Sequence, residues 1–170
     1  MSKVPSLLYS QCFEIQKWVL GETHHDTLET MGKLAYALNK QGKLLEAASL
    51  FEECLKVQKL ILGENNCTTV HTKKSLATNY FAQGRLNEVV LLLQACLDSE
   101  KLVIGESHIV TLQTMHKLAA AYIEVIDNLT PVKLDEVTEL LQQCLARRKS
   151  VHHSEAQVLF KQCLDKRKSS

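Results

Sequence analysis

Six cysteines and seven histidines are the residues of this 170-residue chain that could hold a metal ion or act as nucleophiles. Four of the cysteines, Cys12, Cys54, Cys96 and Cys144, recur at similar intervals, which invites a metal-binding interpretation. A zinc ion needs four ligands, each about 2.3 Å from the metal. The interpretation therefore depends on whether the fold brings these four thiols together.

Cys67 stands four residues before His71, and His24-His25 and His152-His153 are adjacent pairs. A Cys–His nucleophile also needs an orienting group and an oxyanion site, and no such set is visible in the sequence. Adjacent residues on a helix point about 100° apart, so we expect the histidine pairs in loops or at helix starts. The chain also lacks a phosphate-cradling glycine loop, HExxH and Gly-x-Ser-x-Gly. We expect no catalytic residue, no cofactor and no metal site, with an enzyme using Cys67 as the remote alternative.

The elements that position these residues follow from a repeat of 42 residues. Leu20-Gly21-Glu22 is answered by residues 62–64 and by Ile104-Gly105-Glu106, and Leu34-Ala35 recurs at residues 76–77 and 118–119. A fixed period of about 20 to 50 residues is typical of stacked-repeat proteins. Such proteins usually present a binding surface and not a reaction centre.

Each repeat reads as two helices. In the first copy, Thr27, Met31, Leu34, Ala35 and Leu38 form one apolar stripe at spacings of three and four. The stripe predicts a helix over 27–41, with Asp26 or Thr27 as its N-cap and Gly42 at its end. A second helix follows over 43–62, with a broad stripe that includes Leu62, and Gly63 ends it.

The same pattern predicts an all-α fold, a right-handed α-solenoid of about three helical hairpins. Residues 4–20 match only a second helix, and residues 154–168 copy a second helix and should cover the apolar face of the last repeat. The expected organisation is a half repeat (4–20), three repeats (27–62, 69–104 and 111–150, the last with an insertion at 127–132) and a capping helix (154–168).

This organisation decides the cysteine question. The four cysteines occupy equivalent positions in successive repeats, and another helix separates each pair. Packed helices lie roughly 8–10 Å apart, so the four thiols cannot share one ion. We expect them to be small apolar fillers at close helix crossings.

Two motifs resemble the tetratricopeptide repeat. Leu76-Ala77-x-x-Tyr80 and Leu118-Ala119-x-x-Tyr122 match its first helix, and Ala47-x-x-x-Phe51 matches its second. The longer period and the text Leu20-Gly21-Glu22-Thr23-His24 resemble the kinesin light chain type of this repeat. The resemblance implies a non-catalytic scaffold or adaptor whose first helices line a concave face and bind a partner peptide.

Positions on the first helices that lie off the packing stripe are the expected partner-binding residues: Lys33, Tyr36, Asn39, Lys40, His71, Lys74, Ser75, Thr78, Gln113, His116 and Lys117. Lysines outnumber acids on this strip, which favours an extended or helical peptide of acidic character. The alternative is that these are ordinary solvated helix faces. In the family, an asparagine at the positions of Lys33, Ser75 and Lys117 often holds a peptide backbone, and this chain departs from that pattern.

The first helix offers a contrasting hypothesis. Because the repeat pattern starts at a second helix, the segment 4–20 should expose Leu8, Cys12, Phe13 and Trp18. We expect this face to be the cut edge of a longer array, or else to bind a second copy of the chain.

Bulk composition narrows the functional classes that remain for this chain. The net charge is +1, which gives no general attraction to nucleic acid or membranes. Residues 144–170 carry +5 and leave −4 for residues 1–143, a pattern of a solvated basic tail or of contact with an acidic partner. No apolar run reaches the roughly 18 residues of a membrane span, and no signal-peptide core is visible. Six cysteines in this setting predict reduced thiols and a cytoplasmic location.

Overall fold

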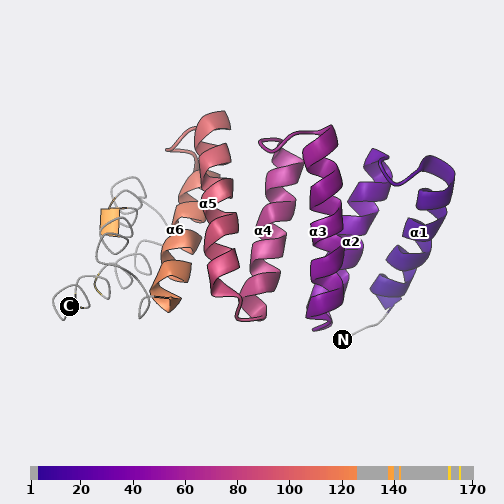
Figure 1. Cartoon of the computed structure of the whole chain (residues 1–170), viewed down its shortest axis with the longest axis horizontal. Coiled ribbons are helices and arrows are strands. Elements are labelled where there is room, and N and C mark those ends of the chain that lie inside the picture. The colour runs from indigo at the N-terminus through magenta and orange to yellow at the C-terminus, as the bar shows by residue number, and fades with distance from the viewer. Residues whose placement is uncertain (1–3, 126–137, 140–141, 143–160, 162–164, 166–170) are drawn as a thin grey trace. The chain divides into compact units, whose positions relative to one another are not determined.

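The computed structural model describes residues 4–125, 138–139, 142, 161 and 165. This part of the chain contains helices and no strand. The helices are α1 (Val4–Leu20), α2 (His25–Lys40), α3 (Leu44–Ile61), α4 (Cys67–Ala82), α5 (Leu86–Val103) and α6 (Ile109–Glu124) (Figure 1). The chain divides into two compact units after Arg85, and each unit is described by itself.

The first unit consists of α1–α4, in which each helix packs against the next one along the chain. Short loops join them, so neighbouring helices run in opposite directions (Figure 1). The predicted stripe of α2 is buried throughout, from Thr27 to Leu38. Leu28 and Met31 of α2 form a core cluster with Cys54 of α3, and Phe13 of α1 packs against it.

The helix ends explain the glycines of the repeat. Gly42 and Gly63 adopt φ values of +79° and +88°, in the left-handed region where a side chain would cost about 1–2 kcal/mol. The glutamates that follow Gly21, Gly63 and Gly105 each form an ion pair with a lysine of the preceding helix. These pairs are Lys17–Glu22 at 2.8 Å, Lys59–Glu64 at 2.9 Å and Lys101–Glu106 at 3.7 Å. The Gly-Glu motif therefore closes the same turn three times.

The helix starts differ from the prediction. The N-cap of α2 is His24, whose Nδ1 accepts a hydrogen bond from the backbone N–H of Asp26 at 3.2 Å, so neither Asp26 nor Thr27 is the cap. Asn66 caps α4 in the same way, with its Oδ1 2.9 Å from the N–H of Thr68. His108 Nδ1 likewise accepts from Val110 N–H at 3.2 Å. These side-chain caps place the starts of α2 and α4 two residues earlier than the apolar stripe alone indicates.

The second unit is described for α5 and α6, which pack against each other. Leu93 and Leu97 of α5 are buried, as are Leu112, Met115 and Leu118 of α6. Residues 126–150 of the predicted third repeat, with its insertion at 127–132, and the predicted capping helix at 154–168 lie outside the described residues, apart from positions 138, 139, 142, 161 and 165.

Burial tests three of the core predictions. Leu34, Leu76 and Leu118 are all buried, which confirms their equivalent roles. Leu62 is exposed because it follows the last turn of α3, so its assignment to the stripe was wrong.

Cys54 and Cys96 are buried fillers as predicted, and Cys144 lies outside the described residues. Cys12 is exposed, because in the described part of the chain no helix covers that side of α1.

Candidate functional site

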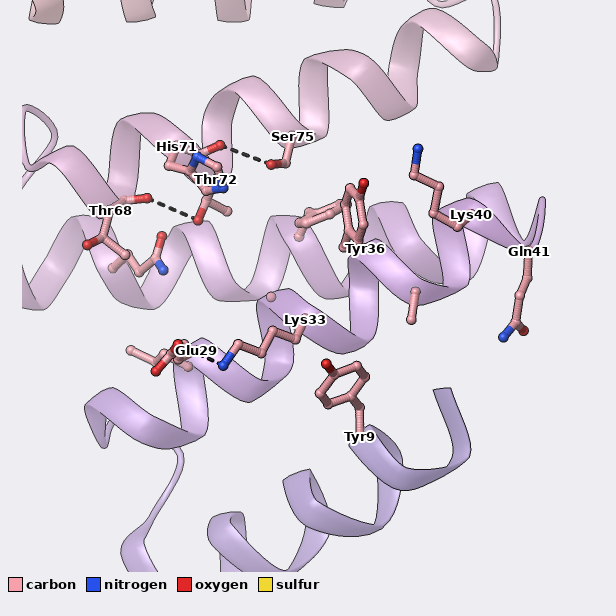
Figure 2. Close-up of a pocket in the computed structure, with 15 residues that line it drawn as sticks. Tyr9, Glu29, Lys33, Tyr36, Lys40, Gln41, Thr68, His71, Thr72 and Ser75 are labelled. Carbon is pink, nitrogen blue, oxygen red and sulfur yellow. Dashed lines mark hydrogen bonds and ion pairs between the residues drawn. The ribbon is translucent and has the colours of Figure 1, made fainter. Parts of the chain in front are cut away.

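The first unit contains a groove of about 950 Å³ whose lining comes from all four of its helices. The groove is lined by Tyr9 of α1, by Leu28, Glu29, Gly32, Lys33, Tyr36, Ala37, Lys40 and Gln41 of the α2 segment, by Phe51 and Gln58 of α3, and by Thr68, His71, Thr72 and Ser75 of α4. In Figure 2, Tyr9 reaches from α1 toward α2, while Tyr36 and Lys40 extend from α2 on the side of α4. The groove thus collects side chains up to 66 positions apart, from Tyr9 to Ser75.

Helix packing explains why a groove forms here. Both α2 and α4 pack on α3, which provides the floor with Phe51 and Gln58. Gly32 adds no side chain to the α2 wall, and an added Cβ there would meet no atom within 4 Å. The result is a largely apolar trough with aromatic rings at Tyr9 and Tyr36, the usual character of a ligand site.

The two lysines of the groove differ in whether a carboxylate neutralises their charge. Lys33 Nζ lies 2.8 Å from Glu29 Oε1, one helical turn away. The hydrogen bond and the charge of Lys33 lower the pKa of Glu29, and Glu29 in turn raises the pKa of Lys33. Lys40 Nζ lies 5.2 Å from the centre of the Tyr36 ring, and no carboxylate pairs with it in the described part of the chain. Lys40 is therefore the cation of this wall whose charge is not neutralised by a neighbour.

The hydroxyl groups on the α4 wall are oriented by the helix itself. Thr72 Oγ1 donates to the carbonyl of Thr68 at 3.2 Å, and Ser75 Oγ donates to the carbonyl of His71 at 3.1 Å (Figure 2). Each hydroxyl proton is used, and Thr72 is buried, so Ser75 Oγ is the hydroxyl oxygen of this pair that can accept a hydrogen bond from a ligand. The wall is suited to N–H donors such as those of an extended peptide backbone.

The structure brings together five of the predicted partner-binding residues: Lys33, Tyr36, Lys40, His71 and Ser75. Asn39 instead belongs to an amide cluster, where its Oδ1 accepts from the buried Asn79 at 3.1 Å. Lys74 and Thr78 lie on α4 outside the groove lining. Gln113, His116 and Lys117 are on α6, in the second unit. A binding role for any of the eleven residues stays a prediction.

Sequence reasoning missed Tyr9, Gln58, Thr68 and Thr72. Tyr9 occupies the slot of Phe51, 42 residues later, and Phe51 is buried on α3. In α1 this slot is only half buried, and the ring borders the groove. Tyr9 lines the groove because no neighbouring helix covers this position of α1 completely. A repeat pattern in the sequence does not report such coverage.

Two other groups of side chains have residue types that could do chemistry. His25, Asp26 and Glu29 place potential ligand atoms within 4.8 Å of one another at the start of α2. All three side chains are exposed, and Glu29 is already paired with Lys33, so nothing in this geometry requires a cation. Cys67 is the first residue of α4, although the predicted second repeat began only at residue 69, and its Sγ lies 4.0 Å from Thr68 Oγ1.

Comparison with known proteins places this architecture in a class of helical repeat proteins. Residues 26–101 match the family model described as tetratricopeptide repeat. A solved structure from Podosopora anserina, described as a kinesin light chain with nearly identical TPR-like repeats, is 25% identical, with a TM-score of 0.81 over 96% of this chain and 79% of that one. A single-residue variant of that protein matches equally well.

BtubC (BKLC) from P. vanneervenii has a TM-score of 0.71 at 17% identity, over 96% of this chain and 70% of that one, and so shows the fold alone. No curated protein sequence matches the chain. In the part that the structure describes, no helix is long and apolar enough to cross a bilayer.

The described part of the chain has an all-α fold of the tetratricopeptide-repeat kind, like that of these solved structures. Residues 26–101 match the tetratricopeptide repeat, and the repeats are similar to the TPR-like repeats of the Podosopora anserina protein. Proteins of this class typically present surfaces for protein–protein interaction.

Proposed function

We propose that this chain is a non-catalytic interaction scaffold that binds a peptide segment of a partner protein in the groove between α2 and α4. The observation that carries the proposal is the groove itself, a trough of about 950 Å³ with an apolar floor, two tyrosine rings and few charges. Large aromatic side chains beside an apolar trough are the common anchors of protein interfaces.

The chemistry of the walls favours a peptide with an acidic residue near Lys40. This lysine projects from the end of α2, where no carboxylate of the described residues neutralises it. His71 lines the opposite wall. The hydroxyl oxygen of Ser75, whose proton is donated to the carbonyl of His71, is placed to accept a hydrogen bond from a peptide N–H group. An acidic partner is thereby steered to the α2 wall and held by its backbone on the α4 wall.

Selection of a random peptide library displayed on phage against the full chain would test the proposal. Selected peptides would then be synthesised and titrated against the wild type, Lys40→Glu and Tyr36→Ala. Lys56→Glu is the matched control, because it makes the same charge change at an exposed lysine outside the groove.

We expect selected peptides to be acidic and to bind Lys40→Glu about 2- to 5-fold more weakly than the wild type, the effect of losing one exposed ion pair. Tyr36→Ala should lose at least about 5-fold through its aromatic contact area. Lys56→Glu should bind as the wild type does. Peptides that bind all four proteins equally would show that this groove is not the binding site.

A further inference from the structure

A smaller recess continues the groove at the end where α2 begins. Its volume is about 270 Å³, and it is lined by His25, Leu28, Glu29, Gln58, Leu62 and Thr68. Four of these residues also line the main groove, so the two spaces are continuous. In Figure 2, Glu29 and Thr68 lie at one end of the groove and Lys40 lies at the other.

The floor of the recess holds a buried amide that the fold does not satisfy. Gln58 of α3 is 2% exposed, and its Oε1 forms no hydrogen bond in the described part of the chain. Native proteins rarely leave a buried carbonyl oxygen unpaired, because it has lost its water and gained no donor. The Gln58 side chain lines both the recess and the groove. Since the last torsion of a glutamine is broad, its amide can turn and present Oε1 to an N–H group that enters the recess.

The rim of the recess is acidic. Glu29 lines it, and the carboxylates of Asp26 and Glu29 have oxygen atoms within 4.8 Å of each other. Lys33 pairs with one of these two carboxylates, that of Glu29. The α2 wall therefore carries carboxylates where the helix begins and the cation of Lys40 where it ends. A ligand that complements this wall carries a positive group at the recess and a negative group at Lys40.

We propose that the recess binds an arginine side chain of the same peptide whose acidic residue pairs with Lys40, an inference that rests on the proposed function. A guanidinium has five N–H donors in a planar fork and no acceptor, so one group can donate both to Gln58 Oε1 and to a carboxylate at the rim. A neutral donor would satisfy Gln58 but would gain nothing from the acidic rim. A lysine ammonium is more strongly hydrated and loses more on entering the recess.

The length of the α2 wall sets the spacing of the two charged residues in the peptide. Lys40 lies 11 positions after Glu29. At about 1.5 Å per helical residue, the two positions are about 16 Å apart along the axis. An extended peptide advances about 3.3 Å per residue. The arginine and the acidic residue should therefore lie about five positions apart in the bound sequence.

The peptides selected against the full chain, synthesised and titrated, test this inference. We expect them to carry an arginine about five positions from an acidic residue, and replacing that arginine by alanine should weaken binding to the wild type about tenfold. Gln58→Leu removes the amide and keeps a similar volume. It should weaken the arginine peptide about tenfold and leave the alanine peptide unchanged, because the two changes remove the same hydrogen bond.

A second variant leaves the buried floor intact. Asp26→Asn changes an exposed side chain at the rim, and it should weaken the arginine peptide about 2- to 5-fold while the alanine peptide binds as before. Glu53→Gln is the matched control, because it makes the same acid-to-amide change at an exposed site outside the groove and the recess. Circular dichroism of each variant confirms that the helices are intact.

The outcomes separate this inference from the proposed function. Peptides that depend on Lys40 and Tyr36 but lack the arginine would overturn the recess assignment and leave the groove as the binding site. Arginine peptides that bind Gln58→Leu and Asp26→Asn as tightly as the wild type would do the same, as would equal losses for the arginine and alanine peptides. A selection without binders, or binders indifferent to every variant, would overturn both proposals.

Discussion

Truncating Leu76 tests the packing on which the whole repeat depends. This side chain on α4 is 2% exposed and occupies the slot that Leu34 and Leu118 fill in the neighbouring repeats. Leu76→Ala removes three buried carbon atoms, and at about 0.8 kcal/mol for each buried CH₂ the transfer term alone is roughly 2.4 kcal/mol. The cavity left behind adds to this value, so we expect a total loss of about 2–5 kcal/mol.

The assay is urea unfolding of the full chain, followed by circular dichroism, with the free energy of unfolding extrapolated to water. Leu60→Ala is the control, because it makes the identical chemical change at a side chain that is 81% exposed. We expect Leu60→Ala to change the free energy by less than about 0.5 kcal/mol. In an array of nearest-neighbour contacts, the loss at Leu76 should also broaden the transition as the middle repeat melts early.

The reasoning would be refuted if Leu76→Ala cost less than about 0.5 kcal/mol, the value typical of surface positions. A loss as large at Leu60 would be equally damaging, because it would show that stability does not follow the burial that the repeat pattern predicts. Either result would remove the equivalence of the three leucines.

Two further predictions concern the helix start and the buried thiol. His24→Ala should lower the free energy of unfolding by about 0.5–2 kcal/mol through loss of the N-cap of α2, whereas His24→Asn should be nearly neutral because Asn66 caps α4 in the same way. Burial raises the pKa of Cys54 to about 11 from 9.0, so the unfolded chain releases this proton first as the pH rises. The protonated thiol therefore contributes to the free energy of unfolding, on the order of 2 kcal/mol. This contribution is fully present below pH 9 and is lost between pH 9 and about 11. Cys54→Ala should flatten that part of the stability–pH curve, whereas Cys67→Ala at the exposed start of α4 should leave it unchanged.

Urea unfolding measures both effects. Equal stabilities for His24→Ala and the wild type would contradict the capping role, as would a large loss in His24→Asn. For the thiol, a Cys54→Ala protein whose stability still falls as steeply above pH 9 would show that another group causes the pH dependence.

Local chemistry explains why so much of the fold could be predicted. Stripes at spacings of three and four fix which residues of α2 face the core, and Gly42 and Gly63 fix where the helices end, because few other residues accept a positive φ. The starts were less predictable. A histidine cap depends on which ring nitrogen meets a backbone N–H, and sequence preference had favoured Asp26 or Thr27 over His24.

The candidate site was only partly predictable for a related reason. The period identified Lys33, Tyr36 and Lys40 as positions off the packing stripe, and the structure places all three in the groove. The period did not identify Tyr9, because a repeat cannot register that this slot is covered less completely in α1 than its equivalent is in α3. A sequence repeat reports what each position resembles, whereas burial depends on which helix lies beside it.

The sequence by itself determined the repeat class, the order of the helices and their buried faces, since all of these follow from periodicity and from residues with narrow backbone preferences. Only the tertiary structure decided which side chains of four separate helices share one groove, and which lysine there lacks a carboxylate partner among the described residues. The physical reason is that helix formation depends on neighbours within a few residues. A binding surface depends instead on distances between residues that are far apart along the chain.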